Sequence, residues 1–258
     1  MRRRALALYT LLVLGALYAP ILVMAAFSFN ASPYFVWKGF TLDWYRAIGE
    51  DRNIRACLWN TLALSGVSTV VSTILGTVAA LAARDAFRGR RLYATLVSLP
   101  VMVPDIVLAI ALLLLFRAVG ATLSLWTAAI AHVTFNLSYV AVVVSARLQG
   151  LDRTAELAAQ DLGATPFAAF WKVTFPAILP GIVSGALLAF TLSFDDFVIT
   201  YFTTGPDSTT LPVLIYSKVR FGGTAEMRAL STAMLVASLA LIAGSLRLSR
   251  APAAGGGR

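Results

Sequence analysis

Six long apolar runs, with few charged side chains inside them, constrain this chain more than any other feature. They fall at Leu6–Phe27, Leu58–Ala83, Tyr93–Phe116, Leu123–Val144, Ala177–Phe202 and Leu230–Leu246. Each is about as long as an α-helix that crosses a ~30 Å hydrocarbon layer. Lipid offers the backbone no hydrogen-bond partner, so helices are required, and the alternating pattern of a membrane barrel is absent. The sequence therefore predicts an all-α integral membrane protein with about six transmembrane helices.

The overall composition supports a membrane environment. Only 13% of the 258 residues are charged, whereas 59% are hydrophobic. A soluble domain carries about 25% charged residues, so this chain could not cover a water-facing surface. We expect one transmembrane domain over residues 1–258, with residues 251–258 as a disordered tail. The arginines at positions 2–4 resemble the start of a signal peptide, but the first run is longer than a typical signal, which favours an uncleaved span.

The positive charges indicate how the chain is oriented in the membrane. The formal net charge is +9, but the cations lie at the ends of apolar runs rather than on one polar face, so we expect no nucleic-acid partner. With the N-terminus inside, thirteen of the 21 Lys and Arg fall in cytoplasmic segments. The short loop Arg84–Arg91 holds four arginines in eight residues. Cytoplasmic loops are enriched in such residues, so both termini are predicted to be cytoplasmic.

Two outer connections are long. Ser28–Ala56 is rich in aromatic residues, which favours contact with the membrane–water interface, with docking of an external partner as the alternative. Thr203–Ala229 contains the turn signal Gly205-Pro206-Asp207. We expect both connections to face the outside.

The cytoplasmic stretch between the fourth and fifth runs, Asp152–Pro176, is predicted to form two short helices. Its first residue or Thr154 can cap the first helix, because a side-chain oxygen accepts from free backbone N–H groups. Gly163 fits the left-handed position that ends a helix. Pro166 suits the first position of the second helix, and the final proline is predicted to end that helix before the next span.

The first of these helices would be only about ten residues long and marginal alone in water. Its apolar side chains, Ala158, Ala159 and Leu162, would pack into a groove on a partner. The alternative is an ordered loop that lies on the membrane surface.

The same stretch resembles the EAA loop of permease subunits in binding-protein-dependent ABC importers. The family pattern is Glu-Ala-Ala, three residues, Gly, nine residues, then an aliphatic residue, one residue, Leu and Pro. It matches here at Ala158, Ala159, Gly163, Val173 and Pro176, whereas Leu157 occupies the glutamate position and Phe175 replaces the leucine. The resemblance implies a coupling helix that contacts a cytoplasmic ATPase through Glu156, Leu157, Ala158, Ala159, Asp161, Gly163 and Ala164.

The resemblance extends over most of the chain. Val103–Ile110, Ala131–Phe135, Ala146–Asp152, Phe190–Phe197 and Thr204–Ser217 are similar to the PotC type of spermidine/putrescine permease. This implies the ABC importer permease fold, a bacterial inner-membrane location, a polyamine cargo and several protein partners. The partners are two copies of a cytoplasmic ABC ATPase, a second homologous permease and an extracytoplasmic solute-binding protein. Because the branch also includes permeases for other solutes, an amino-acid-like cargo or another organic ion stays open.

Three carboxylates lie within the apolar runs, at Asp105, Asp195 and Asp196. Ionisable groups at membrane depth are costly and normally face the bundle interior. Carboxylates suit a cargo with ammonium groups, and Tyr201 would add a cation–π contact. We predict these four residues as the substrate pathway. The alternative is that the aspartates cap broken helices.

Other polar residues favour structural roles. His132, the only histidine, is predicted to make an interhelical hydrogen bond rather than to relay protons. The sequence has no Gly-x-x-x-x-Gly-Lys-Ser/Thr phosphate loop, so ATP hydrolysis would belong to a partner chain. We expect no catalytic residue, cofactor or metal in this chain. An ion-coupled secondary transporter, or a membrane enzyme using Asp195 and Asp196 as a pair, are rival interpretations.

Overall fold

A computed structural model describes residues 2–84, 87–220, 222 and 224–249. Contacts divide the chain into two compact units, Met1–Ala56 with Leu214–Ala237 and Cys57–Val213 with Ser238–Arg258. The described residues are mainly helical, and a single isolated bridge between Asn30 and Phe40 is the strand-like pairing found among them. The predicted tail at residues 251–258 lies outside the described residues.

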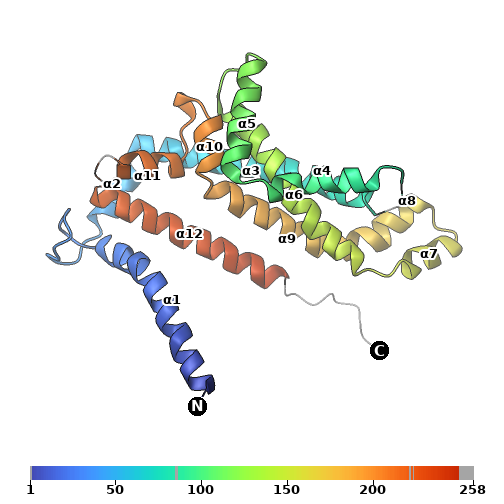
Figure 1. Cartoon of the computed structure of the whole chain (residues 1–258), viewed down its shortest axis with the longest axis horizontal. Helices are drawn as coiled ribbons and strands as arrows, with labels where there is room; N and C mark the ends of the chain where they lie inside the picture. The colour runs from blue at the N-terminus through green and yellow to red at the C-terminus, as the bar shows by residue number, and fades with distance from the viewer. Residues whose placement is uncertain (1, 85–86, 221, 223, 250–258) are drawn as a thin grey trace. The chain divides into compact units, whose positions relative to one another are not determined.

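Twelve α-helices follow one another along the described chain (Figure 1). They are α1 (Arg2–Phe27), α2 (Asp43–Glu50), α3 (Arg52–Ala82), α4 (Arg90–Met102), α5 (Asp105–Ala118), α6 (Leu125–Gln149), α7 (Thr154–Asp161), α8 (Pro166–Ala169), α9 (Phe175–Phe194), α10 (Val198–Thr203), α11 (Leu211–Arg220) and α12 (Ala225–Ser249). A π-helical turn, Phe170–Thr174, joins α8 to α9, and a 3-10 turn, Pro206–Ser208, precedes α11.

Five helical segments are long and apolar enough to cross a membrane. They are Leu6–Phe27, Arg52–Ala82, Leu125–Gln149, Pro166–Phe194 and Ala225–Gly244. A sixth crossing is reached if the bent pair α4 and α5 counts as one span. The predicted all-α membrane fold with about six spans is therefore confirmed.

The third apolar run is not the single helix that its hydropathy suggests. α4 and α5 meet at a bend of 107°. The break falls at Val103, whose extended backbone (φ −82°, ψ 134°) precedes Pro104. A residue before proline is pushed out of the helical region by the proline ring. Asp105 then begins α5, where a carboxylate is favourable near the positive end of the helix.

The predicted end of the second cytoplasmic helix at Pro176 is wrong. α8, the π-helical turn and α9 form one uninterrupted helical path from Pro166 to Phe194. Proline normally breaks a helix because its ring clashes with the carbonyl four residues earlier and it has no N–H. Here the wider π turn comes immediately before, with the Phe175 N–H bonded to the Phe170 carbonyl five residues back. The proline thus enters the first turn of α9, where it is tolerated.

The core of the second unit is built around α6, which runs along α9 (Figure 1). Val140 and Val144 of α6 and Ile178 of α9 are fully buried. Gly76 of α3 meets α6 so closely that an added Cβ would lie 2.7 Å from the Val140 Cβ. Small residues let membrane helices approach in this way. The same packing reaches α10, which contacts both α5 and α6.

In the first unit, Asn30 organises the aromatic connection that follows α1. Its side-chain amide donates to the carbonyls of Tyr34 and Val36, and its oxygen accepts from the backbone of Ser32 and Lys38. These four bonds use the whole hydrogen-bonding capacity of the amide. The connection between α1 and α2 is therefore an ordered loop.

Candidate functional site

The segment between α6 and α9 has the helix–Gly–helix form that its sequence predicts. α7 begins after Asp152, whose Oδ1 accepts from the Thr154 N–H at 2.9 Å. Hydrogen bonds from the hydroxyl and backbone N–H of Thr154 hold the pKa of Asp152 below its usual value. The N-cap residue of α7 itself is Arg153, whose side chain makes no capping hydrogen bond. At the start of α8, the Thr165 hydroxyl accepts from the Ala168 N–H at 3.2 Å.

Gly163 ends α7 in a left-handed conformation with φ +90°. Its N–H bonds to the Gln160 carbonyl at 2.9 Å, and the Ala164 N–H bonds to the Ala159 carbonyl at 3.0 Å. This pair of bonds is the Schellman motif, which satisfies carbonyls left free at a helix end. The turn between α7 and α8 is therefore fixed by hydrogen bonds and by one glycine dihedral.

The surface of this segment carries exposed apolar side chains. No residue of α7 is buried. Leu162 is 90% exposed, Phe167 is 73% exposed and Leu157 is 55% exposed. Burying side chains of this size against another surface lowers the free energy, because it removes apolar area from water. We call the stretch from Asp152 to Phe170 the coupling segment, and its exposed face suits a partner.

Glu156 ties the coupling segment to the rest of its own chain. Its Oε2 lies 2.7 Å from Arg84 Nη2, just beyond the end of α3, and the two side chains are only 22% and 16% exposed. The carboxylate one residue before the family's glutamate position is thus engaged within the chain. Leu157, which occupies that position, points instead to the exposed face.

A second group of polar side chains lies inside the helices of the second unit. His132 of α6 is 1% exposed and bridges two segments. Its Nδ1 lies 3.0 Å from Ser193 Oγ, and its Nε2 lies 2.9 Å from Thr200 Oγ1. Asn136 donates to Ser193 Oγ at 2.7 Å, and Ser68 Oγ of α3 lies 2.8 Å from the same atom. We call these five residues the polar network.

The hydrogen-bond directions in the network assign the histidine tautomer. Thr200 Oγ1 donates to Asp196 Oδ2 at 2.8 Å, so it can only accept from His132 Nε2. In the neutral imidazole, Nδ1 then accepts from the Ser193 hydroxyl. Interhelical hydrogen bonding by His132 is therefore the arrangement found. His132 joins α6 to α9 and α10, and Ser193 extends the network to Ser68 of α3.

Two adjacent carboxylates have different environments. Asp196 accepts from the backbone N–H groups of Ile199 at 3.3 Å and Thr200 at 2.8 Å, so it caps α10, and it lies 3.4 Å from His132 Nε2. Asp195 ends α9 and is exposed. The structure thus brings Asp196 into the polar network and leaves Asp195 with an exposed carboxylate.

The other two residues predicted for the pathway are also exposed. Asp105 lies in the first turn of α5, directly after the bend with α4. Tyr201 of α10 is 46% exposed and stacks at an angle on Phe197, with ring centroids 5.3 Å apart. Within the described residues, no group of three or more His, Cys, Asp or Glu side chains is arranged to hold a metal ion.

One buried cation was missed by the sequence reasoning. Arg228 had been placed in the outer connection, but it lies in the first turns of α12 and is only 9% exposed. Its Nη2 donates to the Pro33 carbonyl at 2.9 Å, and its guanidinium lies 5.0 Å from the Phe35 ring centroid. The signal in the sequence that could have indicated a buried cation is an arginine just before an apolar run. The Arg228 side chain contacts the loop organised by Asn30 within the first unit.

The chain is similar in sequence to known permease proteins over most of its length. The chain is 44% identical over 231 residues to the putrescine transport system permease protein PotI of Escherichia coli (strain K12), covering 85% of this chain and 81% of PotI. It is 40% identical over 245 residues to the spermidine/putrescine transport system permease protein PotC of Haemophilus influenzae, covering 94% and 95%.

Solved structures share the fold at lower identity. The chain matches a bacterial ABC transporter that imports the acidic polysaccharide alginate with a TM-score of 0.69 and 16% identity, covering 96% of each chain. It matches the MetNI methionine ABC transporter with a TM-score of 0.66 and 20% identity, covering 78% of this chain and 98% of that one. At this identity the likeness concerns the fold. The family described as binding-protein-dependent transport system inner membrane component matches residues 72–251, and the chain belongs to that family.

Proposed function

We propose that this chain is the transmembrane permease subunit of an ATP-driven importer whose cargo is a polyamine, putrescine or spermidine. The observation that carries the proposal is the likeness to putrescine and spermidine/putrescine permeases, 44% and 40% identical, over 85% and 94% of the chain. All of residues 1–258 would form one transmembrane domain. The chain itself would be non-catalytic, because its sequence has no phosphate loop to bind ATP.

The coupling segment supports a cytoplasmic ATPase as partner. Its exposed Leu157, Leu162 and Phe167 offer an apolar surface on a turn that is rigidly defined. A second homologous permease, two copies of the ATPase and an extracytoplasmic solute-binding protein would complete the machine. One structural neighbour is an alginate transporter in complex with its periplasmic protein, which fits this set of partners.

Both termini would face the cytoplasm. The loop Arg84–Arg91 has the strongest positive charge, which favours the cytoplasmic side. The ion pair between Arg84 and Glu156 adds independent support, because it joins that loop to the coupling segment. Two connections that the sequence assigns to the same side of the membrane are thus in direct contact.

Cargo recognition would fall to carboxylates. A polyamine carries several ammonium groups, for which carboxylates supply opposite charge and strong hydrogen bonds. Asp196 is already used to cap α10, whereas Asp195 is exposed and free of that role. Asp195, with Asp105 and Tyr201 as further candidates, would therefore contact the cargo, and Asp196 would position α10.

Transport would require two states that bind the partners differently. ATP-driven closure of the ATPases would favour one position of the coupling segment over another, because a ligand shifts an equilibrium only through its differential affinity. The helical path from Pro166 to Phe194 would carry that displacement to the part of α9 next to Asp195.

The test is uptake by the complex reconstituted in proteoliposomes, with labelled putrescine, spermidine and an amino acid. We expect ATP-dependent uptake of a polyamine, abolished when the partner ATPase carries an inactive catalytic site. Uptake that continues without ATP would indicate a secondary transporter. Uptake of only the amino acid would refute the polyamine cargo.

The carboxylate assignment has its own test. Asp195→Asn should raise the KM for polyamine uptake with assembly intact, and the matched control Asp207→Asn, in the exposed outer turn, should leave uptake unchanged. Equal KM values for Asp195→Asn and the unaltered chain would remove Asp195 from the cargo site.

A further inference from the structure

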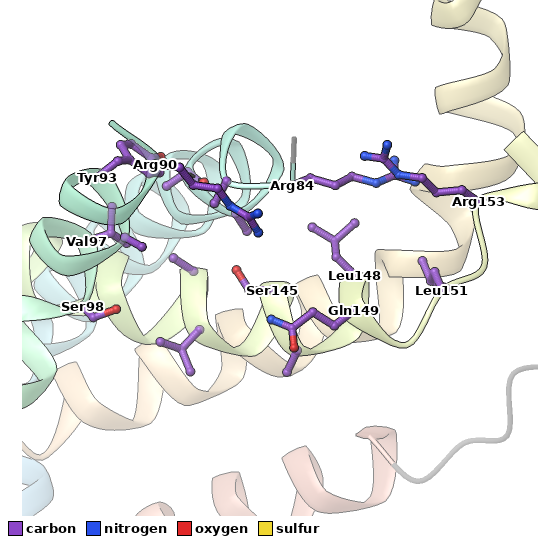
Figure 2. Close-up of a pocket in the computed structure, with 17 residues that line it drawn as sticks. Arg84, Arg90, Tyr93, Val97, Ser98, Ser145, Leu148, Gln149, Leu151 and Arg153 are labelled. Carbon is purple, nitrogen blue, oxygen red and sulfur yellow. Dashed lines mark hydrogen bonds between the residues drawn. The ribbon is translucent and has the colours of Figure 1, made fainter. Parts of the chain in front are cut away.

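The cavity next to the coupling segment is part of that site. It has a volume of about 610 Å³ and lies between the end of α3, the first half of α4 and the end of α6 (Figure 2). Arg84, whose guanidinium pairs with Glu156, is part of its lining. A separate exposed surface lies in the first unit, on residues 31–40 between α1 and α2. We call these residues the aromatic loop.

The aromatic loop exposes most of its large apolar side chains. Between 53% and 73% of the surface is exposed for each of Tyr34, Phe35, Val36, Trp37 and Phe40. A contiguous apolar patch of this kind marks a surface that contacts another protein or a membrane. The loop therefore has an interaction surface, and the question is what covers it.

Hydrogen bonds hold the aromatic loop in one conformation without a partner. Asn30, which is fully buried, binds its backbone through four hydrogen bonds. The Ala31 N–H bonds to the Gly39 carbonyl at 2.9 Å and closes the loop at its base. The Trp44 indole N–H of α2 donates to the Asn30 carbonyl at 2.9 Å. Because the loop is preformed, it loses little conformational entropy when its exposed side chains are covered.

The aromatic loop is fixed to the ends of two candidate membrane spans. The ring of Phe27, the last residue of the first span, lies 5.4 Å from that of Phe35 and 6.0 Å from that of Trp37, measured between centroids. Arg228, in the first turns of α12, donates to the Pro33 carbonyl and lies 5.0 Å from the Phe35 ring centroid. α12 carries the last candidate span. Spans of this length end where the hydrocarbon layer ends, so rings bound to both ends lie at the membrane–water interface.

The charge of the aromatic loop is complementary to a lipid surface. Lys38 follows Trp37 directly, and its side chain is exposed. Residues 31–40 contain no Asp or Glu. A lysine can extend along apolar surface and place its ammonium group among phosphates. Aromatic rings with a nearby cation are typical of segments at the membrane–water interface, so lipid is favoured over a protein that docks from water.

We propose that the aromatic loop is a preformed anchor that inserts its rings between the lipid head groups, on the side of the membrane where α1 ends. The rings would lie among the head groups and the first acyl carbons, and the Lys38 ammonium would reach the phosphates. The anchor would fix the depth at which α1 and α12 meet the interface, because Phe27 and Arg228 bind it to both helices. This inference goes beyond the proposed function and does not depend on the cargo.

The experiment measures the depth of Trp37 by fluorescence quenching. The full-length chain, purified in its complex, is reconstituted in nanodiscs of phosphatidylcholine brominated either on the upper part of the acyl chains or near their methyl ends. The emission of Trp37 is the difference between the unaltered complex and Trp37→Phe, which keeps an aromatic ring at this position. Trp44→Phe gives the emission of Trp44 in the same way, as a matched control, because Trp44 is only partly exposed and its indole N–H is bound within the chain.

Bromine on the upper part of the acyl chains should quench most of the Trp37 emission, because aromatic rings are favoured at that depth. Bromine near the methyl ends and iodide in the water should each quench it less. Either brominated lipid should quench Trp44 more weakly than upper-chain bromine quenches Trp37.

Three results would overturn the proposal. Quenching of Trp37 by iodide alone would place the loop in water, and protection from iodide by the solute-binding protein would make it a docking site for that protein. The absence of quenching by lipid and by iodide would place the loop against another subunit. Equal quenching of Trp37 and Trp44 by bromine would show that the aromatic loop is not a specific anchor. If polyamine uptake fails while lipid still quenches Trp37, the proposed function is refuted and the anchor stands.

The attachment to α12 has its own variant. Arg228→Gln removes the guanidinium that binds the loop to this helix. It should raise the fraction of Trp37 emission that iodide quenches, because the rings are then held less firmly at the interface. An unchanged fraction would show that the anchor does not include α12.

Discussion

Substitution of Gly163 tests the coupling segment most directly. The glycine has φ +90°, and a Cβ added there would meet no atom within 4 Å. A substitution therefore changes the backbone preference without a steric clash. This is an unusual opportunity, because the effect of one dihedral can be separated from the effect of packing.

The magnitude follows from the cost of a left-handed conformation. For an ordinary L-residue it is roughly 1–2 kcal/mol, which lowers the population of the ordered turn about 5- to 30-fold. Gly163→Ala should show this loss, and Gly163→Val a larger one, because β-branched residues avoid positive φ most strongly. Gly163→Asn should retain most of the turn, since asparagine tolerates this region.

The assay compares ATP hydrolysis with polyamine uptake in the same proteoliposomes. We expect the uptake per ATP hydrolysed to fall in the order glycine, asparagine, alanine, valine. Gly120→Ala is a matched control, because Gly120 also has a positive φ of +71° and open space, but lies between α5 and α6. Its coupling ratio should stay unchanged.

Two results would refute the reasoning. If asparagine is as damaging as valine, the dihedral of residue 163 is not the cause. If all three variants transport with the original ratio, the turn between α7 and α8 does not transmit the work of the ATPase.

Further predictions concern stability and the ion pair. Gly76→Ala should destabilise the chain by about 1–3 kcal/mol, because the new Cβ would lie 2.7 Å from Val140 Cβ. Gly66→Ala, whose Cβ would meet no atom within 4 Å, should be neutral or stabilising, and thermal unfolding in detergent measures both variants. His132→Ala should cost about 1–3 kcal/mol in the same assay, because Ser193 and Thr200 lose their buried partner, and an unchanged midpoint would show that the network adds no stability. A double-mutant cycle on Glu156→Gln and Arg84→Gln should give an interaction free energy of about 0.2–1 kcal/mol in unfolding, which weakens as salt is added. An interaction free energy of zero at low salt would show that the ion pair does not hold α7 in place.

The sequence predicted the features that depend on local patterns. Apolar runs of span length identified the membrane helices, and Gly163 between two helix-forming stretches identified the turn. The resemblance to a known loop required no long-range information either. These features could be predicted because each is determined by residues that are close together in the chain.

The features that the sequence did not predict depend on the path of the backbone. Pro176 was expected to end a helix, and only the preceding π turn explains why it does not. Adjacent residues on a helix point in different directions, but the sequence does not say which of Asp195 and Asp196 faces the interior. The structure shows that Asp196 meets His132 and caps α10, whereas Asp195 does not share this capping role. Glu156 and Arg84 are 72 positions apart in the sequence, so no local pattern predicts that they pair.

The uninterrupted helix from Pro166 to Phe194 has a mechanical consequence. Its 29 residues have a length of roughly 40 Å at about 1.5 Å per residue. If this path moved as one body, a rotation of about 10° about its Pro166 end would move its Phe194 end by roughly 7 Å, more than the 5.4 Å pitch of a helical turn. Small angular changes at the coupling segment would then become displacements of several ångströms beside Asp195.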